Sequence, residues 1–438
     1  MTIDQAADQT PGRAAPAAPA DASGDRVWRC PSRFRYWEAR QEPVWQRRER
    51  LVRKVFRHDL FPSDERARML CDDLYGGDPV AERFVDEVFF GEIGHAEGRR
   101  MLTTALAEGI DAVPDAPESM RALFAEFDHV PDWVDRDVVE LGASIWRRWG
   151  TMLFNVAGVI TLEIYTESGV ATPLSLAGGY AGDNALRRFL ESAKFWIDVS
   201  EAGALFRPGS EGRTTAMLVR VMHVAVRRRV AEHPEWDSEK WGLPISQTYM
   251  MLTQVGGSVA PAMALWLLGH QTTPREMRAL LHFNRYMGHL LGVQPQWMPE
   301  TVRDCLQVLA LSVAARSYDS GEHGRELIES FPAAFAPREG QHGLARLRAA
   351  YNHRIVGAYC ALWMAPGTRK AYDLTGAFPW VLILAARWPL VTAVELLRRL
   401  PGLGRLHERA MVAHRLSWWE AQMEGRQAAF DASSSLRR

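Results

Sequence analysis

Hydrophobic positions recur along most of this chain at the spacing of α-helices, and no stretch of convincing length alternates as a β-strand would. Within residues 28–56, Trp37, Val44 and Leu51 stand at heptad-like intervals, which predicts one helix that packs these three side chains. The helical periodicity continues through residues 79–106. The pattern therefore predicts an all-α fold.

Residues that start helices divide the remainder of the chain. Ser63 is expected to be the N-cap of one helix and Asn184 of another, because short polar side chains accept hydrogen bonds from the first free N–H groups. Pro274 is expected to open a further helix, since its missing N–H is not needed there. Residues 151–165 are nearly uncharged and are expected to lie in the interior. Helices are also expected from 131–133, 244, 299 and 344 onward.

The composition divides the chain into four regions. Residues 1–27 are rich in Ala and Pro and predict a disordered tail, and 28–130 predict a helical region packed on the core. Residues 131–360 form the expected core, and 361–438 a helical C-terminal extension. Two apolar stretches could touch a membrane. Glycine, proline and polar residues interrupt the stretch 241–274, and Arg387 and Pro389 interrupt 378–397, so we expect no span and at most a peripheral contact by the second stretch.

Charge and cysteine content exclude several classes of protein. Lys plus Arg (52) nearly balance Asp plus Glu (53), which gives no basic footprint for nucleic acid. The four cysteines, Cys30, Cys71, Cys305 and Cys360, are far apart in sequence and form no CxxC pair. We therefore expect neither a zinc cluster nor a disulfide framework. With no export signal at the start of the chain, the expected location is the reducing cytoplasm.

One histidine stands out among apolar residues. The stretch MLVRVMHVAVRRRV covers 217–230 and has His223 at its centre. In a helix, Val219, Val226 and Val230 lie on the same face as this histidine. A neutral imidazole beside an apolar wall suits a haem iron ligand.

Arg220 and Arg227 flank that face at i−3 and i+4 from His223. Guanidinium groups in those places could pair with the propionates of a haem. The same pattern also fits an ordinary core histidine that is hydrogen-bonded to a neighbour. On pattern alone, both interpretations stay open.

Other metal and nucleophile chemistries lack their motifs. The chain contains no HExxH, GxSxG or GxxxxGK[ST] sequence. ExxH elements of the kind found in di-iron bundles occur three times, but each is disturbed by a nearby glycine, a nearby proline or a loop-like context. These elements are Glu92 to His95, Glu126 to His129 and Glu339 to His342.

Several runs carry a resemblance in a fixed order: PDWVDRDVVELG at 131–142, RRFLES at 187–192, VRVMHVAVR at 219–227, WGLPISQ at 241–247 and HFNRYMGHLLGV at 282–293. Together they resemble the rubber oxygenase (latex clearing protein) and MpaB-type oxygenase family. The resemblance implies a single large all-helical domain, globin-like in class, that encloses a b-type haem. It also implies an oxygenase that cleaves a carbon–carbon double bond of an isoprenoid or related alkene with O₂.

The resemblance further implies roles for particular residues. His223 looks like the iron ligand, and three arginines look like cofactor contacts. Four residues near the distal side look catalytic, with an arginine to hold a charged group, a hydroxyl to hydrogen-bond and a glutamate as a base. The cofactor contacts are Arg220, Arg227 and Arg354, and the catalytic candidates are Arg188, Glu191, Ser192 and Glu167.

The chain departs from the family pattern at two positions, of which the second points away from rubber. Ser192 stands where the family usually has threonine, and Glu191 stands where rubber-cleaving members have lysine. The expected partners are therefore O₂ and a smaller hydrophobic substrate, as in the less characterised branch of the family. A haem-binding sensor without turnover and a haem-free helical protein are the alternatives. The sequence does not indicate an oligomeric state.

Overall fold

The computed structural model describes residues 27–178, 185–374, 378–423, 425 and 428. Within these ranges the regular structure is helical and contains no strand, which confirms the all-α prediction. The expected tail 1–27, apart from Val27, and the expected N-cap Asn184 lie outside the described residues.

In chain order, the helices are α1 (Tyr36–Gln41), α2 (Pro43–Phe56), α3 (Asp64–Asp72), η1 (Asp73–Tyr75), α4 (Pro79–Phe84), the π-helical η2 (Val85–Phe89), α5 (His95–Glu108), η3 (Ile110–Ala112), α6 (Glu118–Asp128), α7 (Arg136–Arg148), α8 (Met152–Ile164), α9 (Ser168–Leu176), α10 (Ala185–Val199), α11 (Glu211–Ala231), α12 (Ser238–Trp241), α13 (Gln247–Gly256), α14 (Val259–Leu267), α15 (Pro274–Leu290), α16 (Val302–Ala315), α17 (Gly321–Ala333), α18 (Gly343–Trp363), α19 (Pro366–Ala371), η5 (Phe378–Trp380), α20 (Val381–Leu397) and α21 (Leu403–Met423).

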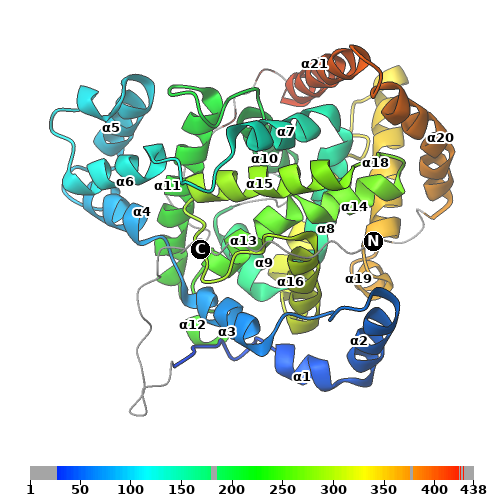
Figure 1. Cartoon of the computed structure of the whole chain (residues 1–438), viewed down its shortest axis with the longest axis horizontal. Coiled ribbons are helices and arrows are strands. Elements are labelled where there is room, and N and C mark those ends of the chain that lie inside the picture. The colour runs from blue at the N-terminus through cyan, green and yellow to red at the C-terminus, as the bar shows by residue number, and fades with distance from the viewer. Residues whose placement is uncertain (1–26, 179–184, 375–377, 424, 426–427, 429–438) are drawn as a thin grey trace.

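Two helix pairs organise the centre of the molecule. In Figure 1, α15 crosses the middle of the view, and it packs along α7. A Cβ atom on Gly142 of α7 would stand 2.3 Å from the carbonyl oxygen of Ala279, so only glycine allows this close approach. The second pair is α10 with α11, and α11 also contacts α4, α9 and α15. The predicted histidine helix is therefore an interior element.

Helix starts predicted from caps and prolines agree with the structure at several points. The Ser63 side chain accepts a hydrogen bond from the N–H of Arg66 (3.3 Å), which confirms it as an N-cap. Pro274 is the first residue of α15, behind a capping box formed by Thr273 and Glu276. The apolar stretch 151–165 forms α8, an interior helix that packs against α14 and α18.

The N-terminal region departs from the predicted single helix over 28–56. Glu42 is extended ahead of Pro43, so the chain forms two helices, α1 and α2. Val44 is 46% exposed and Leu51 60% exposed on α2. The prediction that both pack in the core is wrong, because the heptad spacing runs across a proline break.

A second break interrupts the predicted periodicity of 79–106. Helix α4 passes into the π-helical turn η2, and the chain resumes as α5 only after Gly94. Gly94 has φ +80°, a left-handed conformation that other residues adopt only at a cost.

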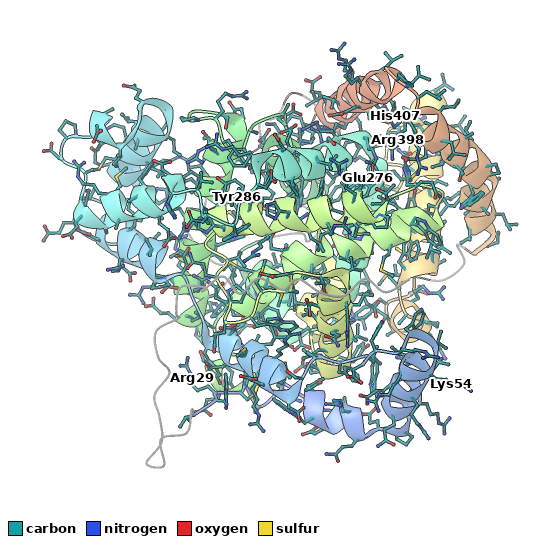
Figure 2. All side chains as sticks on the ribbon, viewed as in Figure 1. Arg29, Lys54, Glu276, Tyr286, Arg398 and His407 are labelled. Atoms are coloured by element: carbon teal, nitrogen blue, oxygen red, sulfur yellow. A yellow bond between two sulfur atoms is a disulfide. The ribbon has the colours of Figure 1, made fainter. Side chains whose placement is uncertain are left out.

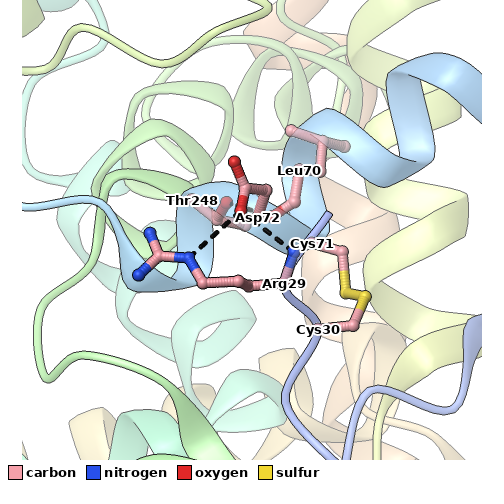
Figure 3. The surroundings of a disulfide bond; sticks show 6 residues. All are labelled: Arg29, Cys30, Leu70, Cys71, Asp72 and Thr248. Carbon is pink, nitrogen blue, oxygen red and sulfur yellow. Dashed lines mark hydrogen bonds and ion pairs between the residues drawn. A yellow bond between two sulfur atoms is a disulfide. The ribbon is translucent and has the colours of Figure 1, made fainter. Parts of the chain in front are cut away.

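The cysteines correct a further expectation. Cys30 and Cys71 form a disulfide (Figure 3), and their Cα atoms lie 5.2 Å apart. The backbone N–H of Arg29 donates to the carboxylate of Asp72 (3.1 Å) and aligns the two segments of chain beside the bond. Cys305 and Cys360 are free and buried. The two cysteines are 41 residues apart in sequence, so no local pattern predicted the pair. They meet because helix α3 brings the chain back towards residue 30.

By length and composition, one described stretch, Gln247–Leu267, is apolar enough to cross a membrane. Its most apolar window is 61% buried within the protein. The stretch is divided into α13 and α14, and it packs against α8 and α15. These contacts are those of interior helices.

Candidate active site

His223 lies in the middle of α11, which starts at the N-cap Ser210. Its Nδ1 atom is buried without a hydrogen-bond partner. Burial, assisted by the positive charge of Arg227, lowers the pKa of His223 to about 4. The imidazole is therefore neutral near pH 7, and its Nδ1 is not committed to the protein.

Arg220 is held one turn before His223 by two carboxylates. Its Nε and Nη2 atoms donate to the two carboxylate oxygens of Asp78 at 2.7 and 2.9 Å, and Nη2 also donates to Glu126 (2.5 Å). Burial lowers the pKa of this guanidinium, but the hydrogen bonds and charges of both carboxylates raise it overall. A Cβ atom on Gly292, which has φ +75°, would stand 2.1 Å from Asp78 Oδ2, so glycine is required there.

Arg227 is held one turn after His223. It donates to Glu82 Oε1 (2.9 Å) and to the carbonyl oxygens of Pro244 (3.1 Å) and Ile245 (2.6 Å). Ile245 has φ +51°, an unusual conformation for a β-branched residue. The guanidinium therefore fixes a strained turn between α12 and α13.

Arg220 and Arg227, which were expected to contact a cofactor, already have partners within the protein. Each guanidinium is buried against carboxylates of its own chain, and Nη1 of Arg220 is a buried donor without a partner. The structure thus gives Arg220 and Arg227 a clear part in positioning α11. Their contact with a cofactor stays a prediction.

Gln247, the last residue of the WGLPISQ segment, connects the chain beside Asp78 to the chain that follows α15. Its Nε2 donates to the carbonyl oxygens of Gly77 (2.7 Å) and Gly292 (2.8 Å), and its Oε1 accepts from the N–H of Gln294 (2.8 Å). Sequence reasoning missed Gln247, Asp78 and Glu82 as parts of this site. The only local signal was that Asp78 precedes Pro79, a pattern typical of an N-cap.

Helix α10 brings three of the catalytic candidates towards α11. Glu191, 4% exposed, accepts from Arg187 Nε (3.1 Å) and Arg188 Nη1 (2.9 Å). Ser192 follows on the same helix and is half-buried. The carboxylate of Glu191 thus pairs with two guanidinium groups near the start of α10.

The register of α10 against α11 sets the height of these residues. Thr215 Oγ1 donates to Asp198 Oδ2 (3.0 Å), close to the loop that joins the two helices. Glu191 lies seven residues before Asp198, and His223 lies eight residues after Thr215. Glu191 and His223 thus each lie about two helical turns from this contact, along their own helices. Glu191 and Asp198 also share a helix face, at i and i+7.

Glu167 lies just before α9. Its carboxylate accepts from the N–H (2.9 Å) and the hydroxyl (3.0 Å) of Ser317. Burial raises the pKa of Glu167 to about 7, although the Ser317 hydrogen bonds act to lower it. It lines a cavity of about 50 Å³ together with Tyr249, whose own pKa burial raises well above its usual range. The carboxyl is thus able to exchange a proton near neutral pH.

Arg354 lies apart from this group. It is exposed on α18, and its guanidinium stands 4.7 Å from the centre of the Trp380 ring. Helix α18 packs against α8, α17 and α20. The structure therefore does not bring Arg354 to α11, because the face of α18 that carries it turns outward.

A larger cavity opens beside α10. It has a volume of about 550 Å³ and is lined by α10, the end of α17 with the residues that follow it, and the end of α21. Apolar side chains such as Leu186, Leu190 and Met423 share the lining with Arg187 and Arg338. The cavity thus combines an apolar wall with cationic groups.

Comparison with known proteins defines the class and then the family. The sequence profile of an oxygenase catalytic domain matches residues 143–399, more than half of the chain, and with the helical fold it defines an all-α oxidoreductase. The profile is described as "ER-bound oxygenase mpaB/B'/Rubber oxygenase, catalytic domain". This chain belongs to that family and is an oxygenase. The match ends within the predicted C-terminal extension.

Two relatives agree with this assignment. The chain is 26% identical to the rubber oxygenase of Streptomyces sp. (strain K30) over 326 residues, which cover 72% of this chain and 74% of the relative. The structure of latex clearing protein in the closed state superposes with a TM-score of 0.60 at 21% identity, covering 82% of this chain and 94% of the other. The superposition shows a shared fold.

Proposed function

We propose that the protein is a haem b-dependent oxygenase that uses O₂ to cleave a carbon–carbon double bond in a small hydrophobic substrate, such as an isoprenoid. The observation that carries the proposal is His223, a half-buried, neutral imidazole whose buried Nδ1 has no hydrogen-bond partner, within the residues that match the oxygenase profile. Those properties fit an iron ligand. The bound haem would supply the activation of O₂.

The protein's contribution begins with holding His223 in place. Arg220 and Arg227 stand one turn on either side of it, and each is anchored to carboxylates outside α11. Buried ion pairs with several hydrogen bonds hold a helix in one register. His223 can therefore remain fixed while its Nδ1 stays free.

Arg188, Glu191 and Ser192 would act on the substrate side. Glu191 orients the Arg188 guanidinium through their ion pair, and the Ser192 hydroxyl lies on the same helix. A guanidinium and a hydroxyl can hold a polar group of the substrate or of bound oxygen. Glu191 is the positioning residue in this arrangement.

Glu167 would serve as the base. Its pKa of about 7 lets the carboxylate accept an allylic proton near neutral pH. Glu163 is a weaker candidate, because its carboxylate already accepts from Thr368 Oγ1 (2.8 Å) and pairs with Arg316.

The substrate is proposed to be smaller than rubber. The lining of the cavity of about 550 Å³ beside α10 does not include His223, Arg188 or Ser192, so the size of the substrate is argued from the sequence. The name of the Streptomyces relative refers to rubber, and Glu191 is the position at which this chain departs from rubber-cleaving members.

The test is to incubate the haem-reconstituted protein with farnesyl or geranylgeranyl compounds under ¹⁸O₂ and to analyse carbonyl products by mass spectrometry. Cleavage of one double bond by O₂ predicts two carbonyl fragments that each carry one labelled oxygen atom. Arg188→Gln is expected to lower turnover by roughly 10²-fold, in the range typical for lost transition-state contacts. Products without label, or no products from any alkene, would contradict the proposed reaction.

The compartment is also a proposal. The start of the chain led to a cytoplasmic expectation, whereas the Cys30–Cys71 disulfide favours an oxidising compartment. Counting thiols in denatured protein isolated under alkylating conditions distinguishes the two. Two reactive thiols, Cys305 and Cys360, indicate an intact disulfide, and four indicate a reducing location.

A further inference from the structure

Helix α20, which forms the C-terminal hairpin with α21, has its polarity reversed. Surface helices usually turn apolar residues to the core and charged residues to water. On α20, the side chains of Glu395 and Leu384 are buried, while Leu382 and Leu390 are 70% and 68% exposed. Helical spacing puts Leu382, Leu390 and Leu397 on one face, opposite the buried pair.

Polar contacts hold the inner face of the hairpin. Glu395 accepts from Arg398 Nε (2.6 Å) and contacts His270 Nδ1 (3.1 Å). Arg398 also donates to the Gln271 carbonyl (3.2 Å) and to Glu276 (3.3 Å). Figure 2 shows Glu276, Arg398 and His407 close together where α15 meets the hairpin. Charged contacts thus hold the inner face of α20 and leave its leucines outside, whereas α21 also packs through Trp418, which stacks on Phe154.

The exposed apolar surface extends onto α14. A Cβ atom on Gly269 would stand 2.9 Å from the backbone oxygen of Trp388, so the end of α14 packs closely on α20. Trp266 and Trp388 are both exposed at this junction. Other exposed apolar residues of the hairpin and of α14 are Met263, Leu267, Val394, Leu396, Leu397, Leu400, Leu403 and Leu406. Such an extended apolar surface marks an interaction site.

The charge near the turn of the hairpin has one sign, whereas farther along α21 Glu408 pairs with Arg147 and Glu420 is exposed. Among residues 378–407 the only acidic residue is Glu395, and it is buried. Arg399 and Arg405 are exposed at the turn of the hairpin. Leucines, tryptophans and arginines without acidic neighbours match a bilayer that carries anionic headgroups.

We propose that the α14 end and the α20–α21 hairpin dock the protein on the surface of an anionic lipid bilayer. Leu390, Leu397 and Leu400 enter the interface, the tryptophans lie at headgroup level, and Arg399 and Arg405 contact the phosphates. The proposal does not rest on the oxygenase reaction, since docking is measured without turnover.

Two other surfaces compete with this assignment. A second copy seated on the hairpin by a two-fold axis would bring the same arginines face to face without acidic partners. Helix α2 also exposes Leu51 and Val55 among basic residues, but its Arg53 is paired with Glu49 and Asp59. The hairpin has the larger apolar area and a single sign of charge at its turn.

The experiment is sedimentation of the full chain with sucrose-loaded vesicles, either of phosphatidylcholine alone or of equimolar phosphatidylcholine and phosphatidylglycerol. The wild type is expected to bind the anionic vesicles more tightly. Leu390→Ser with Leu397→Ser is expected to weaken binding to both vesicles by at least about tenfold, from the loss of two inserted leucines. Arg399→Gln and Arg405→Gln are each expected to weaken binding to the anionic vesicles alone by roughly fivefold.

The matched control is Leu51→Ser with Val55→Ser on α2, which is expected to leave binding unchanged. Circular dichroism of each variant checks that the helices are retained. Loss of binding in the α2 variant with retention in the hairpin variant would overturn the proposal. So would a wild type that ignores both vesicles and forms dimers in sedimentation velocity that Leu390→Ser with Leu397→Ser dissociates, because the surface would then be an interface between copies.

Discussion

The helix that carries His223 and the C-terminal hairpin both depend on buried ion pairs, but they direct their apolar surfaces oppositely. Around α11, Asp78 and Glu82 bind Arg220 and Arg227, and a neutral histidine is left in the interior. In the hairpin, the ion pair of the buried Glu395 with Arg398 places the polar face of α20 against the body, and the leucines of α20 are exposed.

The difference shows what buried charges can do in a helical protein. A buried ion pair adds little net stability compared with an apolar contact, but it specifies which face of a helix meets the core. In α11 this fixes the height and rotation of a single imidazole. In the hairpin it fixes which residues face outward. The two regions should therefore respond differently when a carboxylate is removed.

The largest effect is expected from Asp78→Ala. Arg220 is 1% exposed, and the loss of Asp78 would leave most of its donors buried without a partner. We expect the free energy of unfolding to fall by about 3–5 kcal/mol, as measured by urea denaturation. The control is Asp86→Ala, which breaks an exposed pair with Arg228 and is expected to cost less than about 1 kcal/mol. Equal losses in the two variants would show that Asp78 does not brace α11.

A smaller and local effect is expected from Glu395→Gln, because Arg398 keeps its contacts with Gln271 and Glu276. We expect a loss of about 1–3 kcal/mol, seen as faster hydrogen exchange in α20 rather than in α11. Burial raises the pKa of Glu395, but His270, Arg148 and Arg398 lower it to about 2 overall.

The pH dependence of this contribution follows from the lowered pKa. The stabilisation is present above the unfolded pKa of about 4.5 and is lost as the pH falls from there towards 2. Hydrogen exchange of α20 in the wild type should therefore approach that of Glu395→Gln at acidic pH. A difference between the two proteins that stays constant across that range would contradict the assigned ion pair.

The smallest effect on the free energy of unfolding is expected from Glu167→Gln. Its pH dependence is opposite to that of the Glu395 contribution. Burial raises the pKa of Glu167 to about 7, so the folded protein favours the protonated form. Stability from this group is full below the unfolded pKa of about 4.5 and is lost as the pH rises through 7. Glutamine resembles the protonated acid and does not titrate. We therefore expect the free energy of unfolding of the variant, measured relative to that of the wild type, to rise by roughly 1–2 kcal/mol between about pH 4 and about pH 8.

Thermal or urea unfolding of Glu167→Gln at several pH values checks this prediction. Ser317→Ala, which removes a hydroxyl donor to the carboxylate, should extend the effect to higher pH. A stability difference between the variant and the wild type that stays constant from about pH 4 to about pH 8 would show that folding does not raise the pKa of Glu167.

The sequence predicted those features that local patterns determine. The helical class, the N-cap Ser63 and the start of α15 follow from spacing and cap chemistry within a few residues. The face of α11 that bears His223 follows from its valines, of which Val226 and Val230 pack with Trp236 and Leu176. The family followed from the order of several short motifs, and the profile match confirms it.

The features that the sequence did not predict depend on long-range contacts. Asp78 meets Arg220 across 142 residues and Cys30 meets Cys71 across 41, and neither pair has a local signal. Heptad spacing over 28–56 failed because Pro43 divides the helix and turns Leu51 outward. Arg354, which the family resemblance offered as a cofactor contact, is exposed beside Trp380 on α18, and its role stays a prediction.

The most direct test of the account is the visible absorption spectrum of the haem-reconstituted protein, compared with His223→Ala and His289→Ala. His289 is a partly buried histidine with an unpaired Nε2 on α15, which makes it the matched control. We predict a stoichiometric Soret band in the wild type and in His289→Ala, and its loss or displacement in His223→Ala. A wild type that folds but takes up no haem, or a band that is unchanged in His223→Ala, would contradict the assignment of His223 as the iron ligand.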